Sequence, residues 1–263
     1  MKTVKNTVLI AAVADIHYTK TSQGSLQKVF TQVTDSADIF LLCGDITDTG
    51  MPDEARVLAK DLTSYVKVPI IAVLGNHDHE SGRSAEVEAI LRDAGVTLLD
   101  GTACEFNGIG FVGVKGFAGG FTNRMLQPWG EEIIKHFVQA AIDDALRLDS
   151  ALAKLHTTER IALLHYSPIR ATVEGEHPEI FPFLGSSRFE EPLNRYQVTA
   201  AFHGHAHAGS LEGRTRGDIP VYNVAMPLLH RSFPDRPPFK LIEVQAGERT
   251  SGSSASVSCQ SLT

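Results

Sequence analysis

Aspartate, histidine and asparagine gather in five short clusters along this sequence, and each cluster follows a run of apolar residues. In chain order, the clusters are Asp15-x-His17, Gly44-Asp45-x-x-Asp48, Gly75-Asn76-His77-Asp78, His165 and Gly204-His205-x-His207. Imidazole, carboxylate and a neutral amide oxygen suit Mn, Fe, Zn or Co, whereas calcium would need more oxygen ligands. A solvated turn aspartate or a core histidine would explain any single cluster. Five clusters in the same setting predict a metal centre.

The apolar runs before these clusters are typical of buried β-strands. We expect strands over 7–14, 39–43, 69–74, 161–164 and 199–202. In an open α/β sheet the carboxyl ends of the inner strands border the crevice that binds ligands, so the five clusters would meet there. Alternate residues of an extended strand point the same way, which would let Asp15 and His17 share one locus, and His205 and His207 another.

Apolar residues at helical spacing separate the strands and predict helices over 26–36, 52–66, 84–94 and 131–155. This alternation implies parallel strands joined by right-handed crossovers. Short strands at 96–99, 103–106 and 109–114, the last two joined by Asn107-Gly108, indicate a second sheet, which strands at 221–224 and 240–244 are expected to complete. With no repeat and no linker, we expect one domain over 1–246 and a Ser-rich tail over 247–263.

The amino-acid composition limits which binding partners and which cellular compartment are expected for this protein. The net charge of −7 over 263 residues gives no basic footprint, which counts against nucleic acid and anionic membranes as partners. The three cysteines are far apart and odd in number, so they form no disulfide framework and fit a reducing compartment. No stretch reaches the roughly 20 apolar residues of a membrane span. We expect a cytoplasmic protein; the sequence carries no signal for an oligomeric state.

Together, the five clusters resemble the signature of the calcineurin-like metallophosphoesterase superfamily, which is DxH, GDxxD, GNH[DE], a lone His, and GHxH. The resemblance runs from Asp15 to His207 and is greatest to the small bacterial phosphodiesterase-type members. It implies an α/β fold, a four-layer α/β/β/α sandwich with two divalent metal ions at the strand ends. One ion would take Asp15, His17, Asp45 and His207. The second ion would take Asp45, Asn76, His165 and His205.

The same resemblance assigns the catalytic steps. The two ions would lower the pKa of a bridging water and yield a hydroxide that attacks phosphorus. His77 would not be a ligand but would contact the phosphate and protonate the leaving oxygen, with Asp48 orienting its ring. An N-cap or turn role is the alternative for Asp48. Beside the clusters, Cys43 is expected to be a small core residue that points away from the site, and His203 to pack in the core or to orient a ligand.

The implied activity is hydrolysis of a small soluble phosphoester, with a phosphodiester such as a cyclic nucleotide preferred to a monoester. A nuclease on the same scaffold is one alternative, which the acidic charge disfavours. A binding scaffold without turnover is another, which the complete set of motif residues disfavours. Tyr18, Arg170 and Arg188 are candidates for substrate contact, although surface positions are commoner for such residues. Phe181 and Phe183 could stack on a base or form a hydrophobic lid, although loop packing is the commoner role.

Overall fold

The apolar run that follows Asn6 forms an inner strand of a five-stranded sheet in the computed structural model, which describes residues 7–246. The sheet order is β11-β1-β2-β3-β4. Strands β1 to β4 are parallel, so their carboxyl ends lie at one edge, while β11 is antiparallel to β1. The strand bounds are β1 (Thr7–Val13), β2 (Ile39–Cys43), β3 (Ile70–Val73), β4 (Val96–Leu98) and β11 (Lys240–Gln245).

A second sheet of six strands has the order β5-β6-β7-β8-β10-β9. Strands β6, β7, β8 and β10 are parallel, and β5 and β9 are antiparallel at the two edges. Asn107 and Gly108 both have positive φ between β5 and β6, as the predicted hairpin requires. The strand bounds are β5 (Thr102–Phe106), β6 (Ile109–Gly113), β7 (Glu159–Leu163), β8 (Ala200–His203), β9 (Glu212–Arg214) and β10 (Pro220–Asn223).

Two strands belong to a different sheet from the one predicted. Residues 96–98 pair with β3, and residues 240–245 pair with β1, so both complete the first sheet rather than the second. Local composition indicates that a segment is extended, but its partner is set by the path that the chain takes through the fold. The expected tail over 247–263 lies outside the described residues.

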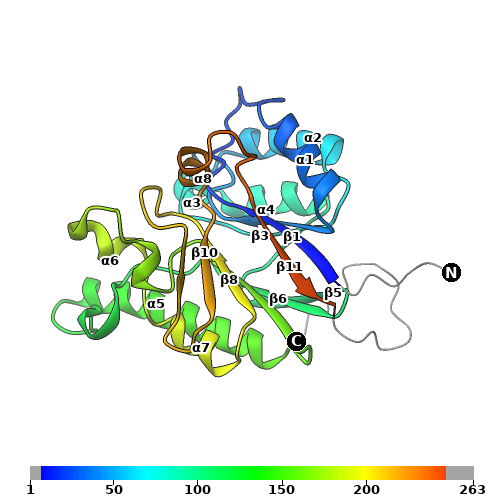
Figure 1. Cartoon of the computed structure of the whole chain (residues 1–263). Coiled ribbons are helices and arrows are strands. Elements are labelled where there is room, and N and C mark those ends of the chain that lie inside the picture. Colours follow the sequence, from blue (N-terminus) through cyan, green and yellow to red (C-terminus); the bar gives the residue numbers. More distant parts are fainter. Residues whose placement is uncertain (1–6, 247–263) are drawn as a thin grey trace.

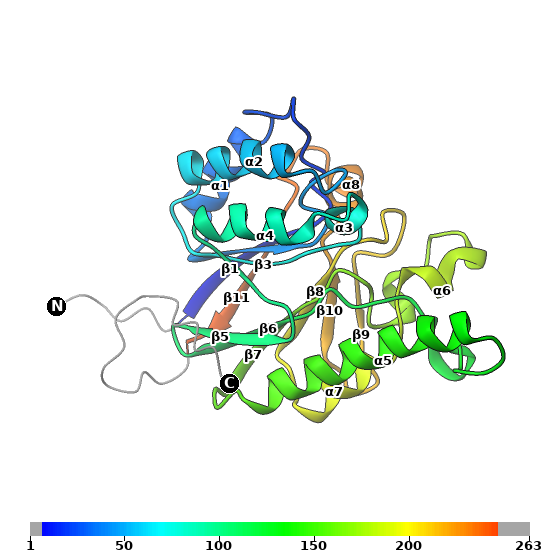
Figure 2. The ribbon, with the colours of Figure 1, turned by 180° about the vertical axis from the view of Figure 1, so that it is seen from behind.

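Helices cover the outer face of each sheet, and the two sheets face each other (Figures 1 and 2). Apolar side chains from both sheets, such as Ile10, Leu41, Phe111 and Phe202, form the core between them. Each sheet also packs against the helices on its outer face, and this packing forms one further core per sheet. The result is the predicted four-layer α/β/β/α arrangement. On the first sheet lie α1 (Gln27–Ser36), α2 (Pro52–Tyr65) and α4 (Ser84–Asp93); on the second lie α5 (Glu132–Ala153) and α7 (Glu190–Arg195).

Short helical segments lie in the loops at the carboxyl edge of the sheets. The loop from 171 to 188 contains α6 (Phe181–Leu184), which lies beside the first turns of α5 in both views (Figures 1 and 2). The Gly119 N–H donates to the Pro182 carbonyl at 2.7 Å, which joins this loop to the one before α5. Two more helices at this edge are α3 (His77–Glu80) and α8 (Met226–Ser232). Within 7–246, no helix is both long enough and apolar enough to cross a bilayer.

Candidate metal centre

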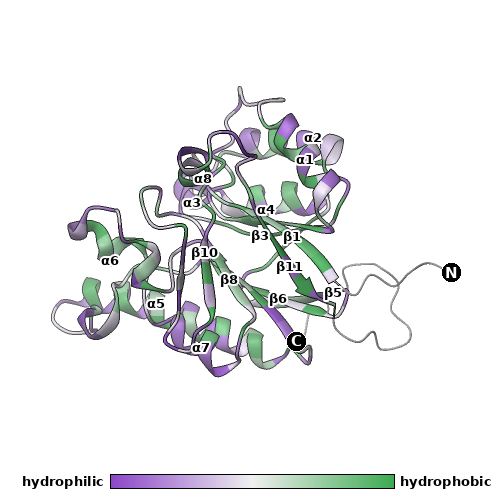
Figure 3. Ribbon diagram, viewed as in Figure 1, coloured by the Kyte–Doolittle hydropathy of each residue, from purple (hydrophilic) through white to green (hydrophobic). Residues whose placement is uncertain are grey.

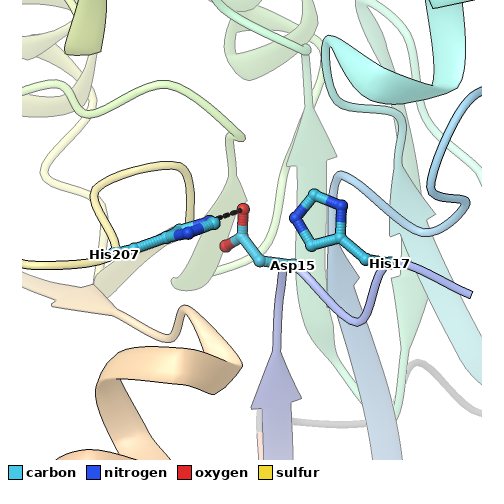
Figure 4. A group of neighbouring side chains, drawn as sticks. All are labelled: Asp15, His17 and His207. Carbon is cyan, nitrogen blue, oxygen red and sulfur yellow. Dashed lines mark hydrogen bonds and ion pairs between the residues drawn. The ribbon is translucent and has the colours of Figure 1, made fainter.

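Asp15, His17 and His207 form the first cluster of possible ligands (Figure 4). Asp15 and His17 follow β1, and His207 follows β8 in the other sheet. The Nε2 atom of His207 lies 3.0 Å from Oδ1 of Asp15, and this hydrogen bond raises the pKa of His207. One ligand atom from each of the three residues lies within 4.8 Å of the others, which is close enough for all three to hold one ion.

Asp45, His165 and His205 form the second cluster. The Nε2 atom of His165 lies 3.3 Å from Oδ2 of Asp45 and 2.9 Å from Oδ1 of Asn76. Burial lowers the pKa of His165, but the Asp45 carboxylate outweighs burial and raises it to about 9. Burial likewise raises the pKa of Asp45, and the attraction of His165 overcomes it and lowers that pKa. Positive charge is therefore favoured between these side chains, and a divalent cation would provide it.

The Asp45 carboxylate belongs to the second cluster and also faces His17 of the first. Its Oδ2 atom is 4.0 Å from Nε2 of His17 and 3.3 Å from Nε2 of His165. The Nε2 atom of His17 is buried and has no hydrogen-bond partner. A buried nitrogen with a free lone pair is costly unless something binds it, and a metal ion would. The donor set and this unpartnered nitrogen fit two divalent ions that share Asp45.

Main-chain carbonyls fix which nitrogen two of these histidines present. His165 Nδ1 donates to the Cys43 carbonyl at 3.0 Å, which leaves Nε2 to face Asp45. His205 Nε2 donates to the Phe183 carbonyl at 3.2 Å, which leaves Nδ1 without its proton. Such partners set the tautomer and ring orientation of a metal ligand. The loop that contains α6 therefore takes part in positioning His205.

His77 begins α3 and turns its Nε2 atom towards the cluster, 3.9 Å from Oδ2 of Asp45. Its Nδ1 donates to the main-chain carbonyl of Asp48 at 2.6 Å. The predicted pairing of Asp48 with His77 is thus present, but the main chain makes it. The Asp48 carboxylate instead lies 3.5 Å from Nδ1 of His17.

Four of the candidate ligands have left-handed backbone conformations. The φ angles are 57° at Asp15, 41° at His17, 47° at Asp45 and 68° at His205. Such angles cost a non-glycine residue roughly 1–2 kcal/mol, and they concentrate at functional sites. These residues follow the strands rather than continue them, so the predicted reason for their convergence, strand alternation, is wrong. Tight turns at the strand ends direct the side chains.

Two motif glycines allow the loops to approach each other. A Cβ atom at Gly44 would clash with the ring of His165, and one at Gly204 would clash with the Asp15 carboxylate. Gly44 also has φ of 85°, which other residues rarely adopt. The glycines therefore leave room for ligands that come from the opposite sheet.

Asp78 is a site residue to which the sequence analysis gave no role. Its buried carboxylate accepts hydrogen bonds from the main-chain N–H groups of Gly75, Ile46 and Thr47 at 2.8, 3.1 and 2.7 Å. The Thr47 hydroxyl donates to it as well, at 2.6 Å. Burial raises the pKa of Asp78, and these donors oppose that effect. Asp78 joins the loops after β2 and β3, and the acidic fourth position of GNH[DE] was its only signal.

The structure separates the three candidates for substrate contact. Tyr18 is fully buried and its hydroxyl donates to the Asp61 carboxylate, so it is neither a surface residue nor open to substrate. Arg170 is exposed and lies over the ring of Phe181, 5.6 Å from its centroid. Arg188 donates to the Leu126 carbonyl at 2.8 Å.

Cys43 and His203 have the structural roles expected of them. Cys43 is buried in the core between the sheets. His203 is also buried, with Nδ1 2.8 Å from the Gly204 carbonyl and Nε2 2.8 Å from the Thr172 hydroxyl. Because both ring nitrogens have partners, His203 has none left for an ion.

Comparison with known proteins gives one family and several similar folds. A family model described as calcineurin-like phosphoesterase matches residues 8–209. No curated protein sequence matches the chain. Phosphopantetheinyl hydrolase from Mycobacterium tuberculosis superposes with a TM-score of 0.61 at 14% identity, over 91% of this chain and 97% of that one. GAP50, the anchor in the inner membrane complex of Plasmodium, superposes with a TM-score of 0.50 at 11% identity, over 85% of this chain and 73% of that one. At these identities the two structures show a shared fold alone.

Proposed function

The chain belongs to the calcineurin-like phosphoesterase family and is a metal-dependent phosphoester hydrolase, and on this premise we propose that it uses two divalent ions to hydrolyse small phosphodiesters. The observation that supports two ions is the place of Asp45, whose Oδ2 atom lies within 4.0 Å of a histidine from each cluster. We also propose a cytoplasmic location, which the odd number and wide spacing of the cysteines favour.

Two sets of residues would hold the ions, which we propose to be Mn, Fe, Zn or Co. Bound there, the ions would activate a water molecule for attack on phosphorus and neutralise charge on the phosphoryl oxygens. The first set is Asp15, His17, His207 and Asp45. The second set is Asp45, Asn76, His165 and His205.

The role of His77 follows from the orientation of its ring. Because the Asp48 carbonyl accepts from Nδ1, the Nε2 atom is the one that faces the candidate ligands. From there Nε2 would contact the phosphoryl group and give a proton to the leaving oxygen, a step typically worth ~10²–10⁴-fold in rate.

A charge count favours a diester over a monoester. Two divalent ions bring four positive charges, and Asp15 and Asp45 bring two negative ones, which leaves about two positive charges. One singly charged diester and one anionic nucleophile would neutralise them. A doubly charged monoester would leave excess negative charge. A cyclic nucleotide, the example that the sequence favoured, is one member of the diester class.

The test is an assay of the Mn-loaded protein with bis(p-nitrophenyl) phosphate and p-nitrophenyl phosphate, beside metal analysis of the same preparation. We expect two ions per chain and faster turnover of the diester. One ion per chain, or no turnover of either ester, would overturn the proposal. Digestion of single-stranded DNA at low salt, faster than turnover of the small diester, would instead identify a nuclease.

A further inference from the structure

A row of aromatic rings leads away from the candidate ligand His205. The centroid of Tyr166 lies 4.4 Å from that of His205, and Phe117 follows at 6.0 Å from Tyr166. Phe137 lies 5.0 Å from Phe117, and Phe183 lies 6.5 Å from Phe137. We call Tyr166, Phe117, Phe137 and Phe183 the aromatic row.

The side chains of the row become more exposed from Tyr166 to Phe183. Tyr166 is 8% exposed, Phe117 and Phe137 are half-buried, and Phe183 is 58% exposed. The main chain of Phe183 lies next to the metal centre, because its carbonyl accepts a hydrogen bond from His205. The row therefore begins at a candidate ligand and ends at the surface.

At its outer end the row meets an exposed apolar patch. Of the nine large apolar side chains exposed within 7–246, six lie in the segments 126–134 and 180–183. These segments lie side by side, because α6 packs beside the first turns of α5, and α6 has the colour of hydrophobic residues in Figure 3. Apolar clusters of this kind mark binding surfaces. The apolar patch consists of Leu126, Trp129, Ile133, Ile134, Ile180 and Phe183.

The geometry of the row favours an aliphatic ligand over a planar base. Successive rings are inclined to each other by 44° to 75°, so no neighbouring pair in the row is parallel and able to enclose a base. Lys115 Nζ lies 4.8 Å from the ring of Phe117 and 5.0 Å from that of Tyr166, and it already donates to the Gly116 carbonyl. A surface of ring edges and hydrocarbon suits an alkyl chain, which needs no hydrogen-bond partners.

We propose that the aromatic row and the apolar patch bind an alkyl chain of the substrate, so that this enzyme hydrolyses amphiphilic phosphodiesters. The inference rests on the proposed function, because the phosphate lies at the metal centre. The reaction is that of any diester: a bond forms between water oxygen and phosphorus, the bond from phosphorus to one alcohol breaks, and that alcohol leaves with a proton. The row joins the patch to the candidate ligand His205, so the occupant that reaches both is the chain of a single amphiphile whose phosphate lies at the metal centre.

The first test measures chain-length dependence. The substrates are methyl, butyl and octyl p-nitrophenyl phosphates, each below its micelle concentration, with the Mn-loaded protein. Burial of each methylene is expected to raise kcat/KM by up to about fourfold. The ratio of octyl to methyl kcat/KM should fall at least tenfold in Phe137→Ala and in Phe183→Ala. It should stay at the wild-type value in Phe233→Ala, a matched control 39% exposed that lies outside the row and patch.

The second test needs no turnover. Trp129 is the single tryptophan of the chain and is 72% exposed within the patch. Octylphosphonate should shift its fluorescence to shorter wavelength in a saturable way, and methylphosphonate should not. Phe183→Ala should weaken the saturation, whereas Phe233→Ala should leave it unchanged.

The outcomes separate this inference from the proposed function. Equal kcat/KM for methyl and octyl esters, or faster hydrolysis of a cyclic nucleotide than of the octyl ester, overturns the aliphatic site and leaves the phosphodiesterase intact. A saturable Trp129 shift without turnover of any ester supports the site and overturns the proposed function. Tight binding to phosphatidylcholine vesicles with no preference among the esters would assign the patch to a bilayer and overturn the inference.

Discussion

The Nε2 atom of His165 lies 3.3 Å from Oδ2 of Asp45, and both side chains are almost wholly withdrawn from water. His165 follows strand β7 of one sheet, and Asp45 follows strand β2 of the other. Their approach closes the gap between the sheets at the carboxyl edge. A buried carboxylate is costly without a compensating cation, and this pair defines where a cation is stabilised.

Replacing the shared carboxylate is expected to reduce metal content more than any other single change. Asp45→Asn removes the negative charge that faces both His17 and His165. We expect metal analysis after dialysis to give at most one ion per chain, against two in the wild type. Asp48→Asn, a control in the same loop at a residue outside both ligand sets, should retain two ions. An unchanged metal content in Asp45→Asn would show that Asp45 is not shared.

Loss of the His77 ring is expected to affect turnover without affecting metal content. His77→Ala should keep the wild-type metal content and lower kcat by ~10²–10⁴-fold, because it removes the proton donor. Asp48→Ala is the matched variant. It keeps the carbonyl that holds the ring, so its kcat should fall far less. Equal turnover of His77→Ala and the wild type would remove His77 from the mechanism.

Asp78 should be important for stability even without metal. Asp78→Asn places an amide N–H₂ among four hydrogen-bond donors, so at least one buried donor loses its acceptor. The expected loss is about 1–3 kcal/mol in the free energy of unfolding. Urea denaturation in the presence of a chelator measures it. Asp53→Asn, at a 60% exposed aspartate, should stay within about 0.5 kcal/mol of the wild type.

The buried phenol of Tyr18 contributes stability that decreases at alkaline pH. Burial raises the pKa of Tyr18, and the hydrogen bond to Asp61 raises it further. The folded protein keeps the neutral phenol, while the unfolded chain ionises from about pH 10, so this contribution is complete below pH 10 and declines above it. Tyr18→Phe lacks the ionisable group. Its stability deficit, about 1–2 kcal/mol at pH 8, should shrink at pH 10.5.

Urea unfolding of the wild type and Tyr18→Phe at these two pH values tests the sign. A deficit that stays constant or grows between pH 8 and pH 10.5 would contradict the expected linkage. The pH 8 measurement alone tests the hydrogen bond, because both folded and unfolded phenols are neutral there.

The candidate ligands could be predicted from sequence because each follows a strand that its own composition reveals. Residues 39–43 are all buried and form β2 with the predicted bounds. The Asn107-Gly108 hairpin was equally local, since the turn needs positive φ at both positions. Parallel strands then bring their carboxyl ends to one edge, which is enough to predict that the clusters meet.

What depended on tertiary packing could not be predicted. The left-handed turns at Asp15 and Asp45 are held by hydrogen bonds from the loops after β8 and β3, and no local pattern encodes such partners. The Asp78 carboxylate accepts hydrogen bonds from main-chain N–H groups of another loop. Its role could therefore not be predicted before the positions of the two loops were known. The sheet to which residues 240–245 belong was unpredictable for the same reason.

The pairing of β1 with β11 has a consequence for biosynthesis. These strands come from opposite ends of the described chain, so on the ribosome the flank of β1 stays unpaired until residues 240–245 have emerged. An open strand edge invites association with other nascent chains. Asp15 and His17 follow directly after β1, so the strand that leads to the first two candidate ligands is also the one whose pairing is completed last.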